Sequence, residues 1–152
     1  MKIRQAKVTD VKEMHKLVEF YANNGEMLHR SLNTMYENIQ EYIVVEDKNK
    51  IIGCGALHVS WEDLAEIKAL AVSEKYKKKG IGKKIVQTLQ KNAQNLGINK
   101  VFALSFKPEF FIKLGYKVIP KETLPHKIWS ECVNCHLFPD CGEVPLLIEL
   151  KK

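Results

Sequence analysis

The sequence predicts one α/β domain of the α+β kind over residues 1–152, with a mostly antiparallel, twisted sheet flanked by helices. Strand-like and helical segments alternate along the chain, and three strand-like segments between 42 and 72 follow one another without a helix. The last of these runs through a glycine-bearing loop directly into an amphipathic helix. The hydrophobic content of 45% and the charged content of 28% are ordinary for a globular chain that buries a core.

The N-terminal segments read as a strand, a helix, a loop and a second helix. Residues 3–6 are strand-like, and Thr9 or Asp10 is expected to cap the first helix, with Glu13 placed for a capping box. Asn-Asn-Gly at 23–25 ends that helix. A loop over 26–31 and a short helix over 33–40 follow. The inward face of the first helix has apolar residues at helical spacing, namely Val11, Met14, Leu17, Val18 and Tyr21.

The three-strand meander covers 42–46, 51–59 and Leu64–Val72. The four residues 47–50 (Asp-Lys-Asn-Lys) indicate a hairpin between its first two strands. Strand alternation predicts that Glu66 and Lys68 share one face of the third strand and that Ile67 and Ala69 share the other.

The C-terminal half begins with the clearest helix, over 80–96, which has apolar residues on one face and Gly97 after it. A strand over 101–105 and a short helix over 109–114 follow, with Pro108 before that helix and Gly115 after it. The last predicted strands cover 116–119 and 144–150. The segment between them, 120–143, is irregular and carries cysteines.

The loop between the meander and the long helix has the features of an anion site. Glycines allow a close approach of the backbone, the start of a helix presents free N–H groups, and the cluster of lysines adds positive charge. The whole chain has 24 basic and 18 acidic residues, a formal charge of +6, which favours anionic partners. A phosphate-bearing small molecule is favoured over nucleic acid, because no basic patch is interleaved with aromatic residues.

The compartment and the cysteines lead to further expectations. No apolar run approaches ~20 residues and no apolar leader follows Met1, so a cytoplasmic protein without membrane contact is expected. Cys54 is expected to be a small buried residue. Cys132, Cys135 and Cys141 with His136 have enough ligands for zinc, but only one pair has the usual spacing, so reduced thiols and no metal are expected.

These motifs resemble the GNAT superfamily of acyl-CoA N-acyltransferases. The order of elements agrees with that fold, and the loop resembles its signature of Arg or Gln, two residues, Gly, one residue, then Gly or Ala. Lys77 takes the first place and keeps the charge, while Gly80 and Gly82 match. The stretch 110–116 is similar to the aromatic-rich segment after the fifth strand. The resemblance implies a mixed sheet that splays between strands four and five.

The same resemblance implies acetyl-CoA as the co-substrate. In GNAT enzymes the backbone of the fourth strand pairs with the pantetheine arm, and Leu70, Ala71 and Val72 are the matching positions here. An N–H group of this stretch would also face the thioester oxygen. The loop and the following turn would hold the pyrophosphate. The remaining residues expected to contact the cofactor are Lys77, Lys78, Lys79, Gly80, Ile81, Gly82, Lys83 and Phe110.

A narrower resemblance is to the acetyltransferase domain of short N-acetylglutamate synthases, on the stretches 27–31, 63–72 and 102–111. It implies acetylation of the α-amine of L-glutamate for arginine synthesis. The context of Glu66 resembles acetyltransferases in which this glutamate is the base, whereas the plain alternative is an exposed charge pair with Lys68. No general acid is assigned, since Phe111 stands where many relatives have Tyr, and Tyr116 is expected to pack in the core.

A substrate with two carboxylates needs cations from different elements. Arg30, in the loop between the first two helices, suits a bidentate grip, and Lys68, Lys107 and the hydroxyl of Ser31 would add donors. The chain is expected to act on a small acidic amino acid, alone or as a homodimer. The alternatives are another small amine, a protein N-terminus, or a nucleic-acid-binding or zinc-containing regulatory module.

Overall fold

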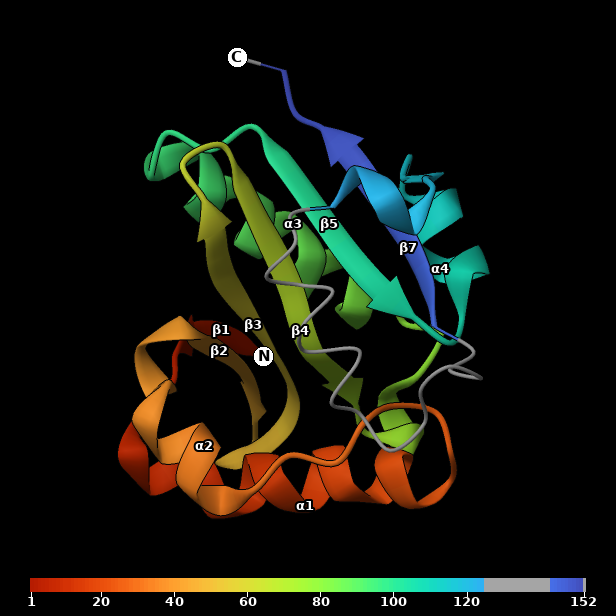
Figure 1. Cartoon of the computed structure of the whole chain (residues 1–152). Coiled ribbons are helices and arrows are strands. Elements are labelled where there is room, and N and C mark those ends of the chain that lie inside the picture. Colours follow the sequence, from red (N-terminus) through yellow and green to blue (C-terminus); the bar gives the residue numbers. More distant parts are fainter. Residues whose placement is uncertain (125–142, 152) are drawn as a thin grey trace.

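A computed structural model of the chain describes residues 1–124 and 143–151, which form a seven-stranded sheet with helices on both faces (Figure 1). All seven predicted strands are present and the predicted fold class is confirmed. The strands are β1 (Lys2–Gln5), β2 (Tyr42–Asp47), β3 (Lys50–Trp61), β4 (Leu64–Val72), β5 (Lys100–Ser105), β6 (Lys117–Val118) and β7 (Val144–Glu149).

Within residues 1–124 and 143–151, four α-helices correspond to the four that the sequence predicts. They are α1 (Val11–Asn23), α2 (Leu32–Glu37), α3 (Ile81–Asn95) and α4 (Pro108–Lys113). Short 3₁₀ turns lie at Val8–Asp10, Ile39–Glu41, Glu74–Tyr76 and Lys121–Thr123. The second helix is shorter than the predicted 33–40, because Asn38 ends it with its side-chain amide donating to the Thr34 carbonyl at 2.8 Å.

The strand order is β1-β2-β3-β4-β5-β7-β6, with β4 and β5 the parallel pair. The predicted β2–β3 hairpin is present, but its loop is two residues long and not four, because Asp47 pairs with Lys50 and only Lys48 and Asn49, both with positive φ angles, lie in the turn. Strands β4 and β5 pair only from Leu64 with Lys100 to Ile67 with Ala103. Beyond that point the two strands diverge, as Figure 1 shows. The splay implied by the family resemblance is therefore confirmed.

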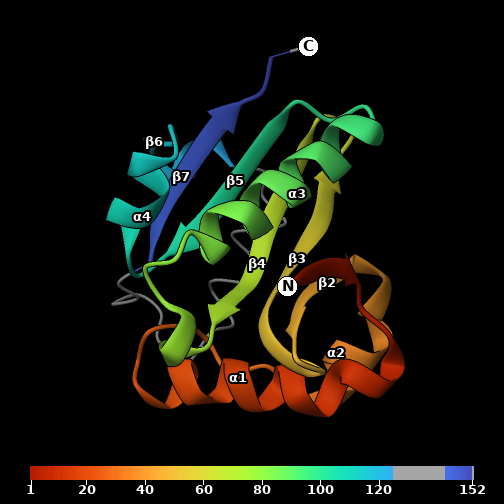
Figure 2. The same cartoon turned by 180° about the vertical axis from the view of Figure 1, so that it is seen from behind.

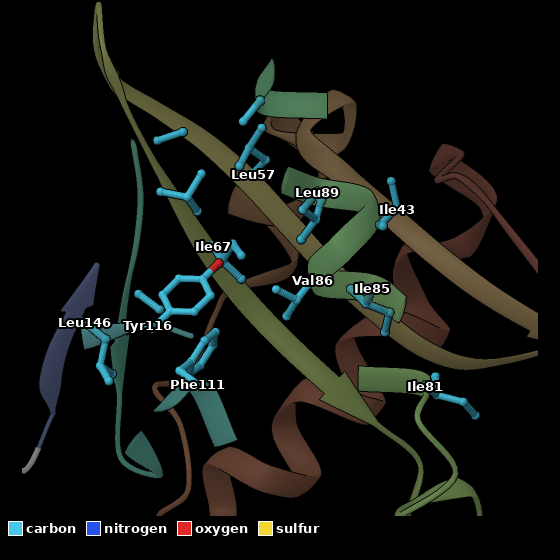
Figure 3. Packing of buried hydrophobic residues seen from close by; sticks show 14 of the residues in the cluster. Ile43, Leu57, Ile67, Ile81, Ile85, Val86, Leu89, Phe111, Tyr116 and Leu146 are labelled. Carbon is cyan, nitrogen blue, oxygen red and sulfur yellow. The ribbon is translucent and has the colours of Figure 1, made fainter. Parts of the chain in front are cut away.

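The two faces of the sheet bury separate cores. Helix α3 covers one face (Figure 2), where Ile85, Val86 and Leu89 pack against strands β2 to β5 (Figure 3). Helix α1 packs on the other face through Met14 and Val18. The amphipathic patterns of both helices therefore predicted their buried sides.

Asp10 is the N-cap residue of α1, as predicted, but its side chain makes no cap bond and the predicted capping box with Glu13 is absent. The Asp10 carboxylate makes no cap bond to α1; it accepts two hydrogen bonds from the Arg4 guanidinium at 2.8 and 3.0 Å and one from the Lys7 N–H at 2.8 Å. Glu13 accepts from the Ile51 N–H at 3.1 Å instead of closing a capping box. The tertiary partners outcompete the local bonds that the sequence suggested.

Of the cysteines, Cys54 is fully buried as expected, and this burial raises the pKa of its thiol to about 12. Cys132, Cys135, Cys141 and His136 lie outside the described residues, as does most of the irregular segment 120–143. Among the described residues, no group of His, Cys, Asp and Glu is arranged to hold a metal. No helix in the described part of the chain is both long and apolar enough to span a bilayer.

Candidate functional site

A cavity of about 620 Å³ opens where β4 and β5 diverge. Its walls come from the second half of β4, the loop into α3, the end of β5, α4 and the loop that follows α1. Eight of its lining residues carry a cationic group and three carry a carboxylate, so the cavity favours anionic ligands. The cationic residues are Arg30, Lys68, Lys77, Lys78, Lys83, Lys107, Lys113 and Lys121.

A β-bulge shapes the edge of β4 that faces this cavity. The register with β3 shifts between Cys54 and Ala56, and Ala69 on the opposite strand has a φ of 53°. Lys68 and Ala69 consequently lie on the same side, and Ala69 packs with the α1 core while Ile67 packs with the α3 core. The expectation that Ile67 and Ala69 share a face is therefore wrong. Beyond Ile67, β5 no longer pairs with the edge of β4.

The loop into α3 has the geometry of an anion-binding turn. Lys78 and Gly80 have φ angles of 63° and 79°, and the helix begins with the Lys84 N–H donating to the Gly80 carbonyl at 3.1 Å. The first turn of a helix leaves N–H groups unbonded and carries the positive end of the dipole. A Cβ on Gly82 would lie 3.1 Å from Cζ of Phe110, so this glycine lets the Phe110 ring approach the helix start.

Glu66 and Lys68 form a pair on one wall of the cavity. The Lys68 Nζ lies 3.7 Å from Oε1 of Glu66, which confirms that the two side chains share a face. Glu66 is only 6% exposed although it is a carboxylate. The plain alternative of an exposed charge pair is therefore wrong, because the pair is largely withdrawn from solvent and lines the cavity.

Arg30 lines the same cavity from the loop between α1 and α2. Its Nε is buried and has no hydrogen-bond partner in the described part of the chain. A buried guanidinium N–H without an acceptor is costly, so this group is poised to take an anionic partner. Burial raises the pKa values of Tyr42 and Cys54, and the positive charge of Arg30 opposes this rise to a smaller extent. The guanidinium therefore lies near β2 and β3, which carry these two residues.

Lys107 also lines the cavity but its ammonium is paired. It follows β5 and forms an ion pair with Glu26, from the loop after α1, and this ammonium holds the pKa of Glu26 below its usual value. The contact joins two parts of the cavity lining that are 81 residues apart in the sequence. The cation predicted for a substrate carboxylate therefore already has a carboxylate partner.

The cavity brings together all but two of the residues predicted for the site. Ser31 is outside the lining, because its hydroxyl caps α2: it accepts from the Thr34 N–H at 3.0 Å and donates to the Thr34 hydroxyl at 2.8 Å. Lys79 is also outside, with its ammonium 5.4 Å from the centre of the Tyr76 ring. The residues brought together are Arg30, Glu66, Lys68, Leu70, Ala71, Val72, Lys77, Lys78, Gly80, Ile81, Gly82, Lys83, Lys107 and Phe110.

Sequence reasoning missed Tyr21 as a cavity residue. Its hydroxyl donates to the Val72 carbonyl, and burial raises its pKa to about 12. The Lys77 ammonium lies 4.5 Å from the centre of its ring. The helical spacing assigned Tyr21 to the core, and no sequence signal marked its second role of tying α1 to the end of β4.

Tyr116 is a core residue, as expected. It is buried, its ring meets Phe111 edge-on at 5.1 Å, and its hydroxyl accepts from the Gln90 amide at 2.8 Å. Burial raises the pKa of this phenol to about 12.

Comparisons with known proteins agree with this architecture. Residues 9–116 match the acetyltransferase (GNAT) family. An "uncharacterized N-acetyltransferase" of Chlorobaculum tepidum is 37% identical over 95% of this chain and 94% of its own length. An amino-acid acetyltransferase of Mycobacterium tuberculosis is 38% identical over 85% of this chain and 75% of its own length.

Two solved structures are similar throughout the chain. Rv2747 from Mycobacterium tuberculosis, in complex with CoA and NLQ, has a TM-score of 0.86 and 32% identity, covering 99% of this chain and 100% of that one. N-acetylglutamate synthase from Neisseria gonorrhoeae, complexed with coenzyme A and N-acetyl-glutamate, has a TM-score of 0.92 and 27% identity. That match covers 99% of this chain but only 35% of the synthase. The chain therefore belongs to the acetyltransferase (GNAT) family and is an acetyl-CoA-dependent N-acetyltransferase.

Proposed function

We propose that the chain transfers acetyl from acetyl-CoA to the α-amine of L-glutamate. The observation that carries this proposal is Arg30, whose buried Nε has no partner in the described residues and which lines the same cavity as Glu66. A cation in this position suits an acceptor that carries a carboxylate. The names of the relatives support the same class, since one is an amino-acid acetyltransferase and a similar solved structure contains N-acetyl-glutamate.

The cavity residues fit acetyl-CoA. The edge of β4 over Lys68–Val72 is not paired by β5 and borders a cavity rich in cationic groups. Leu70, Ala71 and Val72 would pair with the pantetheine amides, although the Val72 carbonyl already accepts from Tyr21. The residues that would hold the pyrophosphate or cover the nucleotide are Lys77, Lys78, Gly80, Ile81, Gly82, Lys83 and Phe110.

Acetyl-CoA, when bound, would supply an acetyl group activated as a thioester; as the amide bond forms, the C–S bond breaks and coenzyme A leaves as a thiolate, which takes up a proton from water. The acceptor must lose a proton first, because an ammonium has no lone pair. Glu66 would accept that proton, directly or through water, since it is the buried carboxylate on the cavity wall. Lys68, whose Nζ lies 3.7 Å from Oε1 of Glu66, is the cation paired with this carboxylate.

The acceptor carboxylates would bind to Arg30 and to the lysines on the neighbouring walls. Arg30 offers a planar fork of donors, which suits the α- or γ-carboxylate. Lys107 lines the same cavity from the segment after β5 and would bind the second carboxylate after it leaves Glu26. A cationic acceptor such as a polyamine would be repelled by the same groups, so the charge of the cavity argues against it.

The test is acetyl-CoA turnover by the full chain across a panel of free amino acids and polyamines. L-glutamate should have the highest kcat/KM, followed by acceptors that lack one carboxylate, such as L-glutamine. Arg30→Met should raise the KM for glutamate by roughly 10- to 100-fold, because hydrogen bonds to charged groups contribute about 1.5–3 kcal/mol. The KM for acetyl-CoA should stay nearly constant. Preference for a cationic amine, or an unchanged KM in the variant, would refute the proposal.

A further inference from the structure

Glu19, on the outer part of α1, is bonded to two successive residues of the loop that carries Arg30. Its Oε2 lies 2.6 Å from Nδ1 of His29, and its Oε1 accepts from the Arg30 N–H at 3.3 Å. The same Oε1 is 3.7 Å from Nε2 of His15, one turn earlier on α1. The hydrogen bond with His29, and to a smaller extent the one from the Arg30 N–H, hold the pKa of Glu19 below its usual value. The carboxylate is therefore ionised while it is bonded to the loop.

This loop has no regular structure of its own, and its path therefore depends on side-chain contacts. Ser31 is fixed by its role as the cap of α2, and Glu26 by the pair with Lys107. Between these points, Glu19 is the one described side chain that bonds to the Arg30 backbone. The Arg30 side chain then runs from this fixed point into the cavity, where its Nε is buried.

From this arrangement we infer that Glu19 is a positioning residue for the acceptor substrate. By holding the Arg30 backbone against α1, it fixes the direction from which the guanidinium enters the cavity. A loop that lost this anchor would have to be ordered when the acceptor binds, and that ordering would weaken the affinity. The inference rests on the proposed role of Arg30, but Glu19 itself does not line the cavity.

The experiment compares Glu19→Ala with Glu19→Gln and with Glu13→Ala. Glu13 is a matched control, because it is a carboxylate on the same helix that accepts a backbone N–H, that of Ile51, at 3.1 Å. Glu19→Ala should raise the KM for the acceptor by about 2- to 10-fold, the loss expected for one typical hydrogen bond, because Glu19 acts on the acceptor only through Arg30. The kcat and the KM for acetyl-CoA should remain close to wild type. Glu19→Gln keeps an oxygen that can accept from the Arg30 N–H and should restore part of the loss.

A readout independent of turnover is hydrogen exchange of the amides at 27–31, which should become faster in Glu19→Ala but not in Glu13→Ala. Equal effects of the two alanine variants, or a parallel change of kcat and both KM values, would overturn the inference. So would an acceptor KM that responds to Glu19→Ala but not to Arg30→Met. The acceptor used is whichever amine the wild type turns over best. If that amine is not glutamate, the proposed substrate is wrong, while the comparison of variants still decides the role of Glu19.

Discussion

Glu26 forms an ion pair with Lys107, the cation proposed to bind a substrate carboxylate. Removing the charge of Glu26 should therefore improve binding of the acceptor. The Lys107 side chain is 58% exposed and that of Glu26 is 27% exposed, so their ion pair belongs to the weak, solvated class. Such pairs contribute about 0.2–1 kcal/mol. When a carboxylate of the substrate displaces Glu26 from Lys107, the free energy of this ion pair is lost. In Glu26→Gln that cost is absent, so the KM for L-glutamate should fall by about 1.5- to 5-fold.

The assay is the KM for L-glutamate at saturating acetyl-CoA, measured at low and at high salt. The gain in Glu26→Gln should shrink as salt screens Lys107. Glu109→Gln is the control, because Glu109 is an exposed carboxylate two residues from Lys107 that does not line the cavity. A KM that rises in Glu26→Gln, or that falls equally in the control, would show that Glu26 supports the loop and does not compete with the substrate.

Three further changes test the site and the fold. Glu66→Gln removes the proposed proton acceptor and should lower kcat by roughly 10²- to 10⁴-fold, most strongly at low pH; wild-type rates across a pH series would exclude Glu66 as the base. Gly55→Ala would place a Cβ 2.8 Å from Cγ2 of Ile85 and should lower the free energy of unfolding in urea by about 1–3 kcal/mol, whereas an unchanged midpoint would contradict the packing. The hydrogen bonds from Arg4 hold the pKa of Asp10 in the folded protein below its usual value. Their contribution to the free energy of unfolding is therefore complete at pH values above the ordinary pKa of Asp. It is lost as the pH falls through the lower pKa of the folded state. Asp10→Asn should therefore cost most stability at neutral pH, and the gap from wild type in urea unfolding should close on acidification; a constant gap would contradict the assignment.

The elements of this fold were predictable because each depends on local patterns. The period of apolar residues located α1 and α3, and the polar residues 47–50 indicated the hairpin, although the turn itself is only two residues long. The position of β7 between β5 and β6 was not predictable in the same way. It depends on pairings such as Phe102 with Leu147, which join residues far apart in the chain.

Much of the site was predictable for a different reason. The strand, the glycine loop and the helix follow one another in the sequence, so the residues that line this side of the cavity could be named in advance. The roles of Tyr21 and Glu26 depend on where the end of α1 meets β4 and the start of α4, which no local pattern encodes. The bulge at Ala69 was missed because alanine, unlike glycine, gives no indication of a positive φ angle.

That bulge has a consequence for how the strand can change. It acts as a one-residue insertion that reverses the inside-outside order between Ile67 and Leu70, and it directs Leu70 and Val72 to the α3 core and Ala71 to the α1 core. Deleting Ala69 would remove the bulge and leave Leu70 and Val72 facing α3, whereas straightening the strand with all its residues kept would turn these two larger side chains into the space that Ala69 and Ala71 now fill. Variants of this strand can therefore lose the extra residue and the bulge together, but they cannot lose the bulge alone at the present length without turning Leu70 and Val72 away from α3.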